Sequence, residues 1–217
     1  MNRQRFETSR LAPLMRAIAG PPFTIVSNNC WGAHVYQAMG LEYRTPFVGM
    51  FIPPKGYLTL LADFDRLMRE PLRFVPRSAS DSVNAWRDAH GLTFPIGILG
   101  DAVEIDFQHY RDEAEVLAKW PARCERMVAD PGRRFFKFDD REGAEASDIE
   151  AFCALPLANK VCFTARPHAV STVVAPAAEG GEHVLDGVGL AQVSRRLFNT
   201  LKWLSPAPAW APVPSLL

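Results

Sequence analysis

The sequence FTIVSNNCWG, residues 23–32, joins a short apolar run to a cluster of polar side chains. Its first half, Phe23 to Ser27, carries the aromatic and β-branched residues that are typical of a buried strand. Its second half places a hydroxyl, two amides and a thiol before a predicted helix that ends at Gly40. In open α/β sheets, ligands bind where the carboxyl end of a strand meets the start of a helix. Residues 27–32 are therefore a candidate binding site.

Strand and helix patterns alternate outward from this stretch. Strands are expected at 72–75, in a hairpin at 94–110 that turns at Gly100-Asp101, and at 133–140, 159–166 and 170–176. The apolar run at 45–54 is bounded by prolines that would fit poorly inside a sheet. Helices are expected at 55–70, at 111–130, from a Ser147 capping box onward, and at 194–204, while 76–93 is expected to be loop or irregular helix. The alternation predicts an α/β fold, a single three-layer α/β/α domain with a mixed β-sheet over residues 21–204.

The ends of the chain differ from this domain. Residues 1–20 combine several arginines with interspersed apolar residues, which predicts an amphipathic helix. This helix could contact a membrane surface or another protein, or it could pack as an ordinary helix. Residues 205–217 form a proline-rich tail without regular structure. No apolar run approaches the roughly 20 residues of a membrane span, and no secretory signal is present, which favours a cytoplasmic protein.

Composition excludes several function classes. Lys+Arg and Asp+Glu are equal at 24 each, so no basic field attracts nucleic acid. The cysteines, Cys30, Cys124, Cys153 and Cys162, show no zinc-finger spacing, and no metal site is expected. The chain contains no G-x-S-x-G elbow, no Walker loop and no G-x-G-x-x-G sequence.

The polar residues after the first strand allow two interpretations. The hydroxyl of Ser27 and the amides of Asn28 and Asn29 could bind sugar hydroxyls or a phosphate, or one amide could cap the next helix. Cys30 lies near the start of that helix, where the helix dipole stabilises a thiolate, and His34 or His109 could serve as its base. The alternative for Cys30 is an inert packed thiol.

Two further strand ends carry candidate groups. His109 follows the alternating strand of the hairpin and could act as a general base, or it could be an ordinary exposed histidine. Asp139 and Asp140 end the FFKF strand and could bind a sugar hydroxyl or a divalent ion, or they could belong to a turn.

An ordered set of motifs resembles a known family. The set comprises SNNCWG (27–32), TPFVGMFIPP (45–54), FPIGILGDAVEIDFQHY (94–110), Trp120 with Arg123, FFKFDDR (135–141), NKVCFTA (159–165) and Lys202-Trp203. It is similar to the DUF1919 family of bacterial proteins, whose members are often labelled exopolysaccharide or capsular polysaccharide biosynthesis proteins. The resemblance implies an α/β fold and a cytoplasmic step in surface-polysaccharide assembly. The shared motifs include Trp31, Tyr110 and Lys160 in addition to the residues above.

Three hypotheses follow. The first is a transferase for an activated sugar or glycan, in which His109 is the base, Trp31 stacks on a sugar ring and Asp139 or Asp140 binds hydroxyls or a metal. A variant is acyl or phosphoryl transfer through Cys30. The second is a non-catalytic carbohydrate-binding or scaffolding subunit, and the third is that residues 27–32 are purely architectural. Neither the residues nor the resemblance identifies a cofactor.

Overall fold

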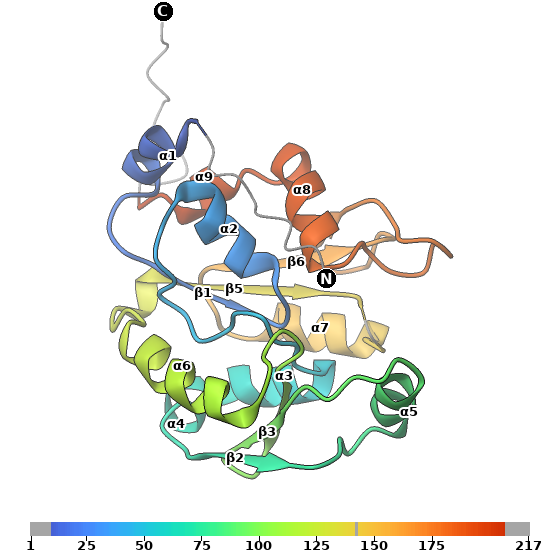
Figure 1. Ribbon diagram of the computed structural model, residues 1–217. Helices are drawn as coiled ribbons and strands as arrows, with labels where there is room; N and C mark the ends of the chain where they lie inside the picture. Colours follow the sequence, from blue (N-terminus) through green and yellow to red (C-terminus); the bar gives the residue numbers. More distant parts are fainter. Residues whose placement is uncertain (1–9, 142, 207–217) are drawn as a thin grey trace, which may run out of the picture.

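The computed structural model describes residues 10–141 and 143–206 (Figure 1). The helices are α1 (Ala12–Ala19), α2 (Trp31–Met39), α3 (Pro54–Ala62), α4 (Phe64–Leu67), α5 (Asp81–Ala89), α6 (Glu113–Glu125), α7 (Ala146–Ala154), α8 (Gly187–Leu197) and α9 (Thr200–Leu204), with a 3-10 turn at Pro131–Arg133. The strands are β1 (Thr24–Ser27), β2 (Leu72–Val75), β3 (Ile96–Leu99), β4 (Val103–Asp106), β5 (Arg134–Asp139), β6 (Lys160–Thr164) and β7 (Val173–Val174).

A parallel sheet in the order β1-β5-β6-β7 forms the centre of the fold. Because its strands are parallel, their carboxyl ends lie along one edge. The register places Ser27 of β1 beside Lys137 of β5, and Asp139 of β5 beside Phe163 of β6. We call this the carboxyl edge of the sheet.

Helices cover both faces of the parallel sheet. In Figure 1, α1, α2, α8 and α9 lie on one face, and α3, α6 and α7 lie on the other. Alternate residues of β5 serve these two layers, since Phe135 packs in the core with Trp31 while Phe138 packs in the core with Tyr57. Apolar side chains therefore occupy both faces of β5, as expected for a central strand.

A second, antiparallel sheet in the order β2-β3-β4 lies beyond the α3 and α6 layer (Figure 1). Its β3-β4 hairpin turns at Gly100 and Asp101, whose φ values are 57° and 54°, as a type I′ hairpin turn requires. The α/β class and the hairpin are both confirmed. The parallel and antiparallel strands, which the sequence assigned to one mixed sheet, are distributed over two sheets.

The elements at residues 23–40 also agree with the sequence. β1 is buried at every position, and α2 ends at Gly40, which adopts a left-handed conformation with φ of 60°. Glycine reaches this conformation without the steric cost that a Cβ imposes, which explains the end of the helix.

Two segments differ from expectation. The region 76–93 contains a regular helix, α5, whose N-cap Ser80 accepts from the Val83 N–H. The predicted helix at 55–70 is divided into α3 and α4 at Asp63. The run 45–54 forms only a single antiparallel bridge, Phe51 with Asp106. This agrees with its bounding prolines, which lack the N–H groups of a ladder.

The later helices begin at other residues than expected. The capping box of α7 consists of Glu145 and Asp148, so Ser147 does not cap this helix. The predicted helix 194–204 is divided at Phe198, whose backbone is extended, and α8 already begins at Gly187. Gly187 and Gly189 lie in the first turn of α8, and Asp186 caps this helix by accepting from the Gly189 N–H at 2.7 Å.

The two ends of the described chain meet at Arg133. Its guanidinium donates to the backbone oxygens of Ala19 (2.8 Å), Pro21 (2.7 Å) and Leu204 (2.7 Å), and so fastens the end of α1 to the end of α9. Of the predicted amphipathic helix at 1–20, α1 covers Ala12–Ala19; residues 1–9 and the tail from 207 lie outside the described residues. No helix in the described part of the chain has the length and apolar character to cross a membrane.

Candidate functional site

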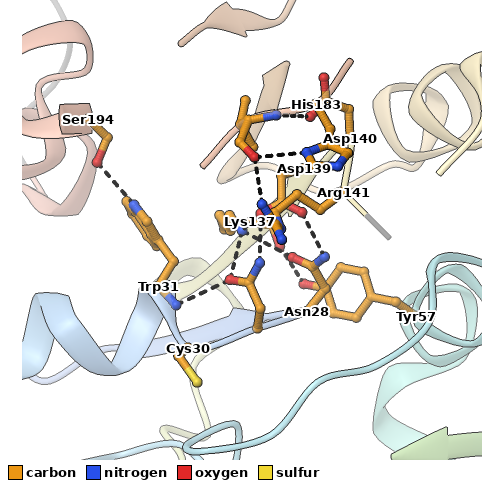
Figure 2. A network of polar contacts seen from close by, with 12 residues as sticks. Asn28, Cys30, Trp31, Tyr57, Lys137, Asp139, Asp140, Arg141, His183 and Ser194 are labelled. Carbon is orange, nitrogen blue, oxygen red and sulfur yellow. Dashed lines mark hydrogen bonds and ion pairs between the residues drawn. The ribbon is translucent and has the colours of Figure 1, made fainter. Parts of the chain in front are cut away.

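A buried network of charges and amides lies at the carboxyl edge of β1 and β5 (Figure 2). Lys137 and Asp139 are two residues apart on β5, so they point to the same face, where they form an ion pair. The Lys137 ammonium also donates to the side-chain oxygens of Asn28 at 3.1 Å and Asn29 at 3.0 Å. The two amide nitrogens in turn donate to Asp139, at 3.1 Å from Asn28 and 2.7 Å from Asn29.

This network keeps Asp139 ionised although neither charge is exposed to solvent. Burial by itself raises the pKa of Asp139, but the Lys137 charge and the amide hydrogen bonds outweigh it, so the pKa lies below its usual range. A buried charge that lost its partner would be strongly destabilising. The side-chain amides of Asn28 and Asn29 are therefore used inside the protein, where they fix the loop after β1 to β5.

The network continues into α2 and from there to α8. Asn29 Oδ1 accepts from the Trp31 backbone N–H at 3.2 Å, and the Trp31 indole donates to Ser194 Oγ at 3.0 Å (Figure 2). Trp31 has no exposed surface and packs against Phe163 and Trp203. The ring faces expected to stack on a sugar are thus covered by core side chains, and Trp31 instead joins two helices.

The first turns of α2 and α8 lie in direct contact. A Cβ placed on Gly187 would be 3.1 Å from the Trp31 nitrogen and 3.2 Å from the Cys30 nitrogen, so a larger residue would push the two helix starts apart. The N-terminus of a helix carries a partial positive charge. Two such ends, those of α2 and α8, therefore meet at this part of the carboxyl edge, and the Asp186 carboxylate caps the start of α8.

Titratable side chains surround these helix ends. The rim cluster, as we name it, comprises Cys30, His34, His109, Asp186 and Arg195. His34 lies one turn after Cys30 on α2, and its ring bonds with Gln37 at 2.9 Å. Burial lowers the pKa of His34; Asp186 raises it, whereas His109 and Arg195 lower it further. Since an ordinary histidine titrates near 6.5, His34 is neutral at pH 7.

His109 belongs to the segment that follows β4. Its backbone N–H donates to the Gly49 oxygen at 3.0 Å, which ties the end of the hairpin segment to the loop 45–53. Its side chain is exposed. Cys30 is half-buried, and its thiol donates to the Met50 oxygen at 3.9 Å. Figure 2 shows the Cys30 sulfur pointing away from Lys137.

The structure places the other predicted residues as follows. Ser27 is fully buried beside Lys137, and its hydroxyl has no hydrogen-bond partner in the described part of the chain. Tyr110 is buried; its hydroxyl donates to the Val48 oxygen at 2.9 Å and accepts from Arg123. Burial raises the pKa of Tyr110 despite the nearby guanidinium. Tyr110 therefore anchors the segment that carries His109.

Asp140 and Lys160 have contacts outside the rim cluster. The Asp140 carboxylate accepts from the backbone nitrogens of Ala165 at 2.6 Å and Val184 at 2.8 Å, and so joins the end of β6 to the segment before α8. Lys160 starts β6 at the opposite edge of the sheet, where its ammonium donates to the Cys153 and Leu155 oxygens at the end of α7. Among the described residues, no three His, Cys, Asp or Glu side chains group as metal ligands do.

Sequence reasoning missed Lys137, Asp186 and Arg195. The signal for Lys137 was its position, because a charged residue between phenylalanines in a strand, two residues before Asp139, must share the face of that carboxylate. Asp186 was hidden by the glycines that follow it, which resemble a loop but begin α8. Arg195 gave no signal of its own, since only the folding of α8 over α2 brings it near His34.

Comparison with other proteins identifies the family. The family model described as "Domain of unknown function (DUF1919)" matches residues 2–205 of this chain. The chain belongs to the DUF1919 family. The predicted resemblance is thus confirmed, and the matched range contains the whole buried network and the whole rim cluster of this DUF1919 domain.

A relative supports this assignment. A Haemophilus influenzae protein named "Uncharacterized protein" is 34% identical over 166 residues, which cover 76% of this chain and 72% of the relative.

Proposed function

We propose that this DUF1919 protein is a transferase that acts on an activated sugar or a growing glycan at the rim cluster. The observation that carries the proposal is the exposed His109 beside the half-buried, neutral His34 at the carboxyl edge of a parallel sheet. Open α/β sheets bind ligands at this edge. A neutral imidazole can accept a proton from an acceptor hydroxyl at neutral pH, which is what sugar transfer needs from a base.

The electrostatics of the rim support a phosphate-bearing donor. The joined N-termini of α2 and α8 attract negative charge, and the Arg195 guanidinium lies near His34. In an activated sugar, negative charge develops on the leaving phosphate as the sugar is transferred. The N-termini of α2 and α8 and the Arg195 guanidinium would stabilise the leaving phosphate, while His109 would take the proton from the attacking hydroxyl.

The buried network supports the proposal indirectly. Catalytic groups act best when they are held in a fixed geometry. The Lys137–Asp139 pair holds Asn28 and Asn29, and these residues hold the backbone from which Cys30 and His34 extend. In this proposal the two asparagines position the site and do not touch the sugar.

The biological role is proposed from the family. Members of the DUF1919 family are often labelled as proteins of exopolysaccharide or capsular polysaccharide biosynthesis, and activated sugars for such polymers are consumed in the cytoplasm. The proposed setting is therefore a cytoplasmic step of bacterial surface-polysaccharide assembly.

Turnover with His109 variants tests the proposal. Purified protein is incubated with nucleotide sugars and short glycan acceptors, and release of the nucleotide is measured. We expect one donor class to be consumed, and His109→Gln to lower turnover by about 10²–10⁴-fold, the usual contribution of a general base. His90→Gln, which changes an exposed histidine at the end of α5, is the matched control and should keep full activity.

Other results would contradict the proposal in distinguishable ways. Equal turnover of His109→Gln and the unchanged protein would remove His109 as the base. A donor or glycan that raises the melting temperature but is never consumed would favour the non-catalytic carbohydrate-binding subunit. A bound ligand at about 100 times its Kd adds roughly 2.7 kcal/mol to stability, which such a measurement detects.

A further inference from the structure

A groove of about 570 Å³ opens beside the rim cluster, between α1, α2, α8 and α9. Sites for small molecules usually have volumes of about 300–1,000 Å³. His34 belongs to both the groove and the rim cluster, so the groove adjoins the proposed catalytic site. From there its walls pass to Met15 of α1 and Leu201 of α9.

The groove has an apolar wall and cationic residues. Most of its lining side chains are apolar, among them Val35, Leu197 and Phe198. Arg195 and Arg196 also line it, and within the described part of the chain neither side chain forms an ion pair or a hydrogen bond. Both arginines are exposed, and an exposed guanidinium without a partner can bind a phosphate.

The apolar surface extends beyond the groove. The helix that supplies Met15, α1, also exposes Leu14 at 56% and Ile18 at 40%, and Leu197 of α8 is 46% exposed. Leu14 and Ile18 are one turn apart, so they lie on one side of α1. An apolar chain longer than the groove would find further apolar surface there.

We propose that this groove binds an amphiphile with a phosphate head group and a single long apolar chain. The phosphate lies at the guanidinium groups of Arg195 and Arg196, and the chain runs past Val35 towards α1. A head group with two negative charges complements two unpaired arginines, and the chain covers the apolar wall. Binding of this ligand goes beyond the proposed transfer reaction, since it requires no donor and no turnover.

Dodecyl phosphate, kept below its micelle concentration, is the probe, and binding to the purified chain is measured by calorimetry. We expect saturable binding of one molecule, with dodecanol and inorganic phosphate each at least about tenfold weaker, because each lacks one half of the ligand. Arg195→Ala/Arg196→Ala should weaken binding by at least about tenfold. Lys55→Ala/Arg69→Ala, which removes two exposed cations away from the groove, is the matched control and should bind like the unchanged protein.

A second variant tests the position of the chain. Val35 is half-buried in the groove wall, so the larger side chain of Val35→Trp can extend into the groove without disturbing the core. We expect this variant to fold, as far-UV circular dichroism will show, and to lose binding of dodecyl phosphate.

Three outcomes would overturn the proposal. Equal binding of dodecanoate would show that the head-group site is not built for phosphate. Unchanged binding in Val35→Trp would place the chain outside the groove. Binding only to anionic vesicles, with none of monomeric dodecyl phosphate, would assign the arginines and α1 to a membrane surface. Because no donor is present in any arm, failure of the transfer reaction would not affect these results.

Discussion

The Lys137 ammonium and the Asp139 carboxylate form an ion pair on one face of β5, and neither side chain is exposed to solvent. The pair is completed by two asparagines from the loop after β1. Every protein group in this set has a partner, so the pair tolerates burial. Loss of one member would leave the other charge without compensation.

Lys137→Met should therefore be strongly destabilising. It leaves the Asp139 carboxylate buried without its cation, for which we expect a loss of about 3–5 kcal/mol of unfolding free energy in urea denaturation. Lys137→Met/Asp139→Leu, which removes both charges, should cost less than the sum of the single variants. Arg73→Ala breaks an exposed pair with Asp101 and serves as the control with nearly unchanged stability. A Lys137→Met protein as stable as the control would contradict this account.

The lowered pKa of His34 predicts a pH dependence of stability. In the folded protein His34 takes up its proton at a lower pH than in the unfolded chain. As pH falls below about 6.5, the unfolded state gains protons first, so the unfolding free energy should decrease. His34→Gln should remove this component, whereas His90→Gln should retain it. Asp139, whose pKa is also lowered, contributes only below about 3.9, so the two windows are separate.

Asp186→Asn should change His34 without unfolding α8. Asparagine remains a good N-cap and can still accept from the Gly189 N–H. The Asp186 charge raises the pKa of His34, so its removal should lower that pKa further in a histidine titration followed by NMR. An unchanged or higher pKa in the variant would show that the Asp186 carboxylate does not act on His34.

Gly187→Ala should separate α8 from α2. The new Cβ would lie 3.1 Å and 3.2 Å from backbone nitrogens of Trp31 and Cys30, which cannot rotate away. We expect a lower melting temperature. Gly56→Ala is the matched control, because Gly56 lies within α3 and its Cβ would meet its nearest neighbour, the Ile52 side chain, at an ordinary 3.7 Å. Alanine also favours a helix over glycine by about 0.5–1 kcal/mol. A melting temperature that rises in both variants would contradict the close contact.

Elements that depend on local sequence were predictable. The β-branched run of β1, the left-handed stop at Gly40 and the Gly100-Asp101 turn each follow from residues that are neighbours in the chain. The same holds for the polar loop after β1, whose position at a strand end marked it as a candidate site. Side-chain alternation in β5 would also have predicted that Lys137 shares a face with Asp139.

What could not be predicted depends on distant contacts. Nothing near Asn28 in the sequence indicates that its amide is used by Lys137 and Asp139. Likewise, the sequence around Trp31 does not indicate that Ser194 and Trp203 cover the indole. The interpretation of these residues as ligand-binding groups assumed that they were exposed, and only the packing of α8 over α2 shows that they are internal.

The partners in the buried network are far apart in the chain, so they leave the ribosome at different times. Asn28 and Asp139 are 111 residues apart, and Trp31 and Ser194 are 163 residues apart. At a synthesis rate of about 5–20 residues per second, the loop after β1 leaves the ribosome roughly 5–20 seconds before the charges that hold it. During that interval β1 also lacks β5, its neighbour in the sheet. A nascent chain cut short before residue 139 would carry Asn28, Cys30, His34 and His109 and still be unable to assemble the rim.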